Sequence, residues 1–328
     1  MNIVSYSVCQ QVRPIVNFQR PLSMEPFFRY LRKEKVVVII GATGTGKSKL
    51  AIDLASSFPP AEIVNSDKMQ VYQGLDITTN KVTDDECRGV PHHLLGIADA
   101  NSNFTADDFT RHASAAIDSI VQRDCLPIIA GGSNSYIEAL VEDHAAFRLK
   151  YECCFLWVDV PLHALDPFLS ERVDRMIQAG QLDEVRQFFD PARDYTTGIR
   201  KAIGVPEFDE FLRAEATADG GTKKRLLEAA IAKIKANNCS LARRQLQKIH
   251  RLYNMWKRNM YRLDTTEVFK KSGDEAEQLW QTQVLAKSQR IVHKFLYDDS
   301  PVVPAATVMS SVPPYPQPKQ VAMATASH

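Results

Sequence analysis

Residues 41–48 form a segment that could bind phosphate groups. Its glycines would let backbone N–H groups surround phosphate oxygens, and a following helix would direct its positive end at them. Lys47 would neutralise phosphate charge and Ser48 would hold Mg²⁺. The alternative interpretation of the segment is a glycine-rich turn that arose by chance. The segment matches the G-x-x-x-x-G-K-[ST] pattern and reads Gly41, Ala42, Thr43, Gly44, Thr45, Gly46, Lys47 and Ser48.

A second polar segment, residues 65–81, contains a carboxylate, an amide, a phenol and an amine. The phosphate-binding pattern alone would favour ATP as ligand and an NTPase or kinase as function. The acid that could complete such a site is Asp159, but one acid at the end of a predicted strand does not establish it. The 65–81 segment therefore indicates a different chemistry.

Strands that alternate with helices must position these two segments. The order predicts an α/β fold, a P-loop NTPase-like parallel sheet flanked by helices, with ligands at the carboxyl ends of the strands. A smaller helical domain is expected to follow it. Buried strands are predicted at 35–40, 61–64, 126–130 and 155–160, and helices at 48–57 and 107–122.

After residue 160 the strand pattern disappears and helices are predicted at 169–179, 182–189, 206–214 and 222–262. The last stretch has no Gly or Pro and carries twelve Lys or Arg residues against one acid, Glu228. Because so long a helix is unusual in a globular domain, we expect a break or a bend in it.

The chain is divided accordingly into five parts. The first 24 residues contain two arginines, three serines and no acid, which fits an organelle transit peptide or an ordinary disordered N-terminus. The tail is rich in proline and lacks acids, so disorder is expected there. The parts are 1–34 (transit peptide or disorder), 35–160 (P-loop core), 161–221 (helical substrate-binding subdomain), 222–299 (long basic helix and C-terminal helices that return to the core) and 300–328 (disordered tail).

Bulk properties leave the partners open. The net charge of +1 does not indicate a nucleic acid, and no apolar stretch approaches the ~18 residues that span a bilayer. The six cysteines contain no C-x-x-C pair, and the adjacent Cys153 and Cys154 lie in an apolar stretch, so reduced thiols inside a cell are expected. We expect a monomer without membrane contact, located in the plastid or alternatively in the cytoplasm.

Seven blocks in order give the sequence its resemblance to the isopentenyltransferases, over about residues 35–260. Each block is modest by itself, and the ordered set is specific. The blocks are the P-loop with the S-D-x-x-Q-x-Y-x-G-L-D-I-x-T-x-K pattern that begins at Ser66, then residues 89–94, 104–109, 131–136, 172–176, 202–208 and 241–246.

The resemblance implies transfer of a dimethylallyl group from dimethylallyl diphosphate to N6 of an adenine, with the P-loop holding the diphosphate. The N6 lone pair is delocalised into the ring, so a carboxylate that takes its proton would assist the attack. Asp67 matches the general base of the family, and the local competitor Asp76 is alternatively a turn residue. Thr43 matches the position whose hydroxyl contacts the bridging oxygen of the donor.

Charge on the leaving diphosphate would be stabilised by Lys47, by P-loop N–H groups and by Mg²⁺ held at Ser48. Arg243 matches a basic family position that binds the diphosphate, and Arg244 follows it; both are alternatively solvated residues of a helix face. The tRNA-modifying members carry an Arg four residues earlier, where this chain has Cys239, so diphosphate binding must be shared differently here.

The acceptor is expected to be free ADP, ATP or AMP, as in the plant adenylate enzymes that begin cytokinin synthesis. Residues 131–136 and 203–207 resemble those enzymes, and no cysteine follows Cys239 to form the zinc finger of eukaryotic tRNA enzymes. The basic 222–262 stretch could instead follow an RNA backbone, as in a tRNA dimethylallyltransferase or an RNA-binding module. Candidate acceptor-binding residues are Ser66, Gln70, Lys81, Ser133, Lys201 and Lys224.

His92 and His93 resemble a pair of metal ligands. Because adjacent residues point in different directions and no other His or Cys lies at ligand spacing, a role in loop packing is preferred. Mg²⁺ is the cofactor that the sequence implies, and a P-loop kinase remains the alternative enzyme.

Overall fold

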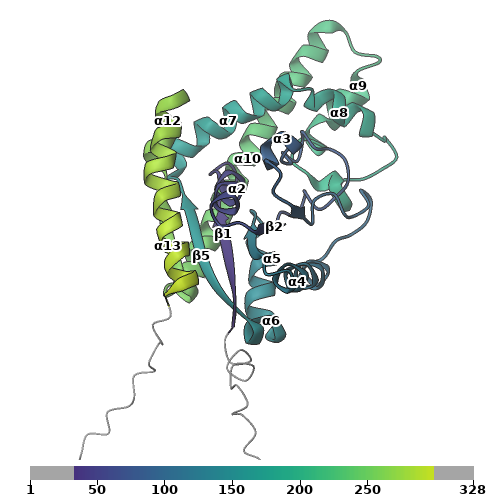
Figure 1. Ribbon diagram of the computed structural model, residues 1–328. Helices are drawn as coiled ribbons and strands as arrows, with labels where there is room; N and C mark the ends of the chain where they lie inside the picture. The colour runs from purple at the N-terminus through teal and green to yellow at the C-terminus, as the bar shows by residue number, and fades with distance from the viewer. Residues whose placement is uncertain (1–32, 299–328) are drawn as a thin grey trace, which may run out of the picture.

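The computed structural model describes residues 33–298 (Figure 1). The transit-peptide and proline-rich-tail predictions concern residues that lie almost entirely outside this range. Among the described residues, no helix has both the length and the apolar character that a membrane crossing requires.

Six parallel strands form one sheet in the order β3-β2-β4-β1-β5-β6. The strand before the P-loop, β1, lies between β4 and β5, so the loop leaves the sheet near its centre. The four predicted strands are confirmed, and β5 begins four residues earlier than expected. The strands are β1 (Glu34–Gly41), β2 (Ala61–Asn65), β3 (His92–His93), β4 (Leu126–Ala130), β5 (Tyr151–Asp159) and β6 (Met260–Asp264).

Both faces of the sheet are buried, which explains why β1 is apolar at every position from Val36 to Ile40. Alternate residues face opposite layers: Val38 packs with one cluster and Val37 with the other. The first layer contains α4 (Ala106–Gln122), α5 (Asn134–Glu138), η1 (Ala139–Asp143) and α6 (Ala145–Lys150); the second contains α2 (Lys47–Ser57), η4 (Trp280–Leu285) and α13 (Ala286–Tyr297).

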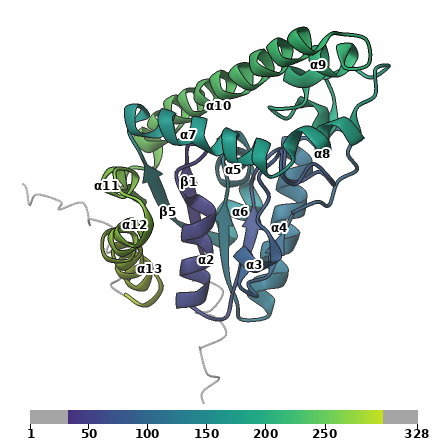
Figure 2. The same cartoon turned by 90° about the horizontal axis from the view of Figure 1, so that it is seen from above.

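A group of helices lies across one end of the strands (Figure 2). Their apolar side chains form a separate cluster that includes Val71 and Leu75 from the loop after β2. The helices of this group, with the cluster they share, correspond to the predicted smaller helical domain. They are α7 (Leu162–Gln178), α8 (Gln181–Phe188), η2 (Gly198–Lys201), η3 (Pro206–Phe208), α9 (Asp209–Ala214) and the first part of α10 (Gly220–Trp256).

The long basic stretch differs from its prediction in two respects: its helix has no break, and it ends at Trp256 instead of continuing to residue 262. The helix α10 runs without a break from Gly220 to Trp256, because its apolar residues meet the helical cluster first and the sheet layer later. It then ends, and the chain forms β6, which pairs with β5 from Phe155 to Asp159. The remaining short helices are α3 (Asp84–Cys87), α11 (Thr266–Phe269) and α12 (Gly273–Leu279).

Candidate active site

A cavity of about 750 Å³ opens at the carboxyl ends of the strands, and we call it the central cavity. The P-loop forms one wall and the loop after β2, with Asp67, forms another. Helix α7 and helix α10 contribute Arg172 and Arg244. The two polar segments of the sequence therefore meet in one space, as the predicted sheet edge required.

The P-loop has the backbone shape that its glycines permit. Gly44 and Gly46 have φ angles of 82° and 93°, in the left-handed region that favours glycine. Behind the loop, a Cβ at Gly41 would lie 2.6 Å from the Val158 carbonyl oxygen. The cavity-lining residues of the loop are Thr43, Gly44, Gly46, Lys47 and Ser48, whereas Gly41, Ala42 and Thr45 lie behind them.

Lys47 is the cation at the base of the loop. Its Nζ donates a 2.7 Å hydrogen bond to the Ala42 carbonyl oxygen. Burial lowers the pKa of Lys47 to about 8; Asp67 opposes this shift and the positive charge of Arg172 adds to it. A buried ammonium group whose pKa is lowered in this way is stabilised when an anion binds next to it. The loop is therefore arranged for a phosphate ligand.

Arg172 is a functional candidate that the residue-by-residue sequence assignment missed. It donates 3.1 Å and 3.0 Å hydrogen bonds from Nη2 to the Thr43 hydroxyl and to Asn238 Oδ1. Burial lowers its pKa to about 10, and within residues 33–298 no carboxylate lies at ion-pair distance from it. A partly buried guanidinium without a counter-ion is a binding group for an anion.

Asp67 faces the same cavity. Its Oδ1 accepts the Met69 N–H at 2.9 Å, which holds the carboxylate and leaves its other oxygen available. The competitor Asp76 is exposed, pairs with Lys81 at 2.7 Å and lines a neighbouring open cavity instead. The geometry thus favours Asp67 as the base.

Gln245 joins the P-loop to the loop after β4; it lies in the 241–246 block of the family resemblance but was not among the predicted site residues. Its Oε1 accepts the Thr43 N–H at 2.7 Å, and its Nε2 donates to the Gly132 carbonyl at 2.9 Å. A Cβ at Gly132 would lie 2.7 Å from that nitrogen and 3.4 Å from an Asp67 oxygen. One amide therefore sets the spacing between the wall with the phosphate loop and the wall next to Asp67.

The two consecutive arginines of α10 have different surroundings. Arg244 lines the central cavity, whereas Arg243 is exposed and pairs with Asp166 at 3.0 Å. Of the two sequence candidates for the diphosphate, the structure places only Arg244 at the cavity.

The candidate acceptor-binding residues lie in different places relative to the central cavity. Gln70, Ser133 and Lys201 line the central cavity, whereas Lys81 belongs to the neighbouring one. Ser66 is fully buried behind the wall, and Lys224 is exposed on the first turns of α10, outside both cavities.

Lys68 and Lys248 complete a cationic side of the central cavity that the sequence reasoning missed. Both residues line the cavity together with Lys201. The pKa of Lys68 is lowered, first by burial and then by the charges of Lys248 and Lys201. Three amines that repel one another in this way would bind an anionic ligand favourably. No sequence pattern around Lys68 or Lys248 indicated that these lysines would line a binding site.

Half of the twelve Lys and Arg residues in the 222–262 stretch form ion pairs with acids from other segments. The 222–262 stretch contains one acid, but its cations pair with carboxylates of α5, α7 and α9 and of β5. The ion pairs are Lys233–Glu210, Lys235–Asp174, Arg243–Asp166, Lys248–Glu138, Arg251–Glu138 and Arg262–Asp159. Part of the positive charge that could have followed an RNA backbone is therefore neutralised within the protein.

The histidine pair forms β3 at the edge of the sheet. His93 Nε2 lies 2.6 Å from a Glu62 oxygen, and His92 Nδ1 lies 2.8 Å from the Val90 carbonyl. Within the described chain, no three His, Cys, Asp or Glu side chains gather where they could hold a metal ion. The described cysteines, which include Cys153 and Cys154, are free.

Ser48 suits the role of a magnesium ligand. Its side chain is exposed and lines the cavity next to Lys47. Mg²⁺ in phosphate sites takes one or two protein oxygens and fills its other positions with phosphate oxygens and water. A single hydroxyl at the end of the P-loop therefore fits this ion without a cluster of carboxylates.

Comparison with known proteins shows strong similarity. The family model described as IPP transferase matches residues 70–148 and 142–251. Adenylate isopentenyltransferase 5 (chloroplastic) of Arabidopsis thaliana is 59% identical, over 94% of this chain and 95% of that protein. Adenylate isopentenyltransferase 7 (mitochondrial) of the same plant is 53% identical over 89% of each chain. The adenylate isopentenyltransferase of Humulus lupulus is 43% identical over 79% of this chain and 89% of that protein.

Solved structures with the same fold act on tRNA according to their descriptions. A eukaryotic dimethylallyltransferase acting on tRNA has a TM-score of 0.69 and 25% identity, over 81% of this chain and 80% of that one. A tRNA isopentenylpyrophosphate transferase from Bacillus halodurans has a TM-score of 0.62 and 25% identity, over 81% and 99%.

Proposed function

The chain belongs to the IPP transferase family, among its adenylate isopentenyltransferases, and we propose that it transfers a dimethylallyl group from dimethylallyl diphosphate to N6 of free ADP or ATP, and also of AMP. This reaction begins cytokinin synthesis. The observation that carries the proposal is that Asp67, the P-loop and a second group of cations line one cavity.

In the reaction, the bond between C1 of the dimethylallyl group and the diphosphate oxygen breaks while a bond from N6 to C1 forms. Asp67 takes the proton that N6 loses, and inorganic diphosphate leaves. Holding both substrates at the correct distance converts a bimolecular step into an intramolecular one. Gln245 supports this by bonding to both Thr43 and Gly132.

The donor diphosphate would be held by Lys47, Arg172 and Arg244, which line the central cavity. Because charge grows on the leaving group as the bond breaks, preorganised cations stabilise the transition state more than the ground state. Arg172 also fixes the Thr43 hydroxyl, which the family resemblance places at the bridging oxygen.

Mg²⁺ would bind at Ser48 together with diphosphate oxygens. When bound, it would supply positive charge to the leaving group. Removal of divalent ions with a chelator should therefore abolish transfer, and added Mg²⁺ should restore it.

Lys68, Lys201 and Lys248 would receive the phosphates of the acceptor. They line the central cavity together with Gln70 and Ser133, and Lys248 also pairs with Glu138 at 3.1 Å. A compact cationic group suits a nucleotide with two or three phosphates, whereas the partial neutralisation of α10 makes this helix less suited to an RNA backbone. These observations favour a free nucleotide over tRNA, the acceptor in the descriptions of the structural neighbours.

The test is product formation measured by mass spectrometry. Purified protein receives dimethylallyl diphosphate and Mg²⁺ with AMP, ADP, ATP or unmodified tRNA. Prenylated free nucleotide that disappears in Asp67→Ala would support the proposal. Prenylated tRNA alone would support the proposed chemistry but contradict the proposed acceptor. Consumption of ATP without prenylation would favour the alternative function, a kinase.

The location of the enzyme is proposed to be an organelle, and among organelles the plastid. Relatives that match most of the chain carry the names chloroplastic and mitochondrial. Fusion of residues 1–34 to a fluorescent protein tests this: plastid fluorescence supports it, and a cytoplasmic signal contradicts it.

A further inference from the structure

Trp280 contacts the P-loop from outside the central cavity. A Cβ at Gly46 would lie 2.9 Å from Trp280 Cη2, so the edge of the indole lies directly against the loop backbone. Gly46 is also the N-cap of α2, immediately before Lys47. Trp280 is 3% exposed and does not line the cavity. The position of this ring therefore limits where the last glycine of the loop can lie.

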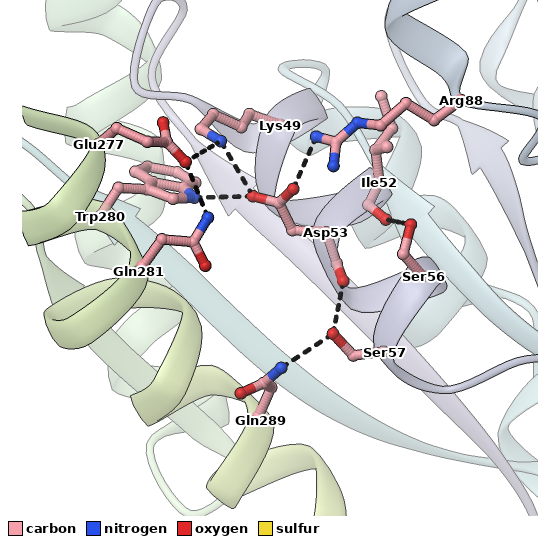
Figure 3. A network of polar contacts seen from close by, with 10 residues as sticks. All are labelled: Lys49, Ile52, Asp53, Ser56, Ser57, Arg88, Glu277, Trp280, Gln281 and Gln289. Atoms are coloured by element: carbon pink, nitrogen blue, oxygen red, sulfur yellow. Dashed lines mark hydrogen bonds and ion pairs between the residues drawn. The ribbon is translucent and has the colours of Figure 1, made fainter. Parts of the chain in front are cut away.

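Asp53 holds the indole in that position (Figure 3). Its Oδ2 accepts the Trp280 Nε1–H at 2.7 Å, and its Oδ1 accepts a 2.7 Å bond from Arg88. Lys49 contributes a third bond, at 3.2 Å to Oδ2. Asp53 is 4% exposed, and a carboxylate so buried is tolerated only with such partners. The network joins α2, the loop after α3 and the C-terminal helices.

Apolar packing and hydrogen bonding have different effects at this contact. Trp280, Val284, Leu285 and Val292 pack in the same cluster as Leu50 and other residues of α2, which attaches the C-terminal helices to the sheet layer. Such packing does not by itself determine how the indole is rotated. The bond to Asp53 is directional and aims the ring edge at Gly46.

We infer that Trp280 and Asp53 are positioning residues for the donor diphosphate site and that the C-terminal helices belong to the catalytic unit for this reason. The inference rests on the proposed function, because the donor diphosphate is the ligand whose cradle contains Gly46. Small displacements of groups that hold a reacting ligand weaken its binding and its reaction.

The structure provides matched controls on the other face of the sheet. Trp256 is 7% exposed and also donates its indole N–H to a carboxylate, that of Glu142. It stacks on Phe155 and belongs to the opposite apolar cluster. Trp280→Phe and Trp256→Phe thus remove equivalent interactions, but only the first alters a contact with the P-loop. Asp53→Asn and Glu142→Gln form a second matched pair with smaller changes in shape.

The experiment measures the binding of inorganic diphosphate with Mg²⁺ by calorimetry, at a temperature where circular dichroism shows each variant folded. Trp280→Phe and Asp53→Asn should raise Kd by about fivefold to tenfold, near one hydrogen bond to a charged group. Trp256→Phe and Glu142→Gln should lower Tm while leaving Kd unchanged. KM for dimethylallyl diphosphate should rise in the first pair only, with a smaller change in KM for the nucleotide.

Equal diphosphate affinity in the two pairs would overturn the inference and leave the proposed function intact. If wild-type protein binds diphosphate but prenylates nothing, the proposed function fails, and the calorimetric comparison still tests the positioning role. If Trp280→Phe does not fold, the Asp53→Asn and Glu142→Gln pair decides.

Discussion

The Arg172 guanidinium donates a 3.1 Å hydrogen bond to the Thr43 hydroxyl, across 129 positions of sequence. It also donates to Asn238 at 3.0 Å, so one side chain of α7 joins the P-loop to α10. Three segments that the sequence separates thus form one anion site around a cation that no carboxylate within residues 33–298 neutralises.

Arg172→Gln should lower kcat/KM for the donor by about 10²-fold, because preorganised charge at the leaving group is lost. Arg172→Lys keeps the positive charge but not the planar fork, and it should recover part of the loss. Steady-state kinetics with varied dimethylallyl diphosphate measures both. Unchanged kinetics in Arg172→Gln would show that the guanidinium only joins helices.

Arg244→Gln and Arg243→Gln should differ although the residues are adjacent. Arg244 lines the cavity, so its loss should raise KM for the donor by about tenfold, near one charge-assisted hydrogen bond. Arg243→Gln removes an exposed ion pair with Asp166. Such a pair contributes at most about 1 kcal/mol to stability, and this one contributes nothing to donor binding. The opposite ranking in donor kinetics would contradict the assignment.

Asp67→Asn should lower kcat by about 10²- to 10⁴-fold, the range for loss of a general base. The Met69 N–H would still find an acceptor in the amide oxygen, so diphosphate affinity should remain close to that of wild type. Asp76→Asn removes a carboxylate of the same loop that lies outside the central cavity, and near-normal turnover is expected. Single-turnover rates distinguish the two variants.

Donor binding should weaken as the pH rises through about 8. Burial lowers the pKa of Lys47 to about 8, so below this pH the amine is charged and above it progressively neutral. The bound diphosphate favours the charged form and raises this pKa, so binding takes up a proton above pH 8. Arg172, with a pKa of about 10, remains charged up to about pH 9.

Calorimetry with inorganic diphosphate from pH 7 to 9 measures this effect. Kd should be constant near pH 7 and then rise by up to about tenfold per pH unit, the limit for one linked proton. Lys47→Arg should remove the pH dependence, since arginine remains charged throughout. A wild-type Kd that is flat across this range would contradict the role of Lys47.

Much of the fold could be predicted because its signals are local. The four predicted strands and the helix α2 are confirmed. The strands could be predicted because continuous apolar stretches are typical of parallel strands buried on both faces. The strand β6 was missed because only two of its five residues are buried and it lies in a basic segment, so that only pairing with β5 makes it a strand. The expected break in α10 is absent because α10 packs against two different clusters along its length.

The P-loop and the place of Asp67 after β2 could be predicted from local sequence alone. The loop is eight consecutive residues whose glycines and following helix shape the backbone locally, and Asp67 lies two residues after the end of β2. Such features need only the sheet order to bring them together.

Which cations face the central cavity depends instead on how the helices pack. Neighbouring residues on a helix point about 100° apart, so the rotation of α10 about its axis separates Arg244 from Arg243, and packing sets that rotation. The same holds for Arg172, Gln245 and Trp280, whose partners Thr43, Gly132 and Asp53 lie more than a hundred residues away in the chain. No local pattern encodes such contacts, because they depend on how complete helices pack against the sheet.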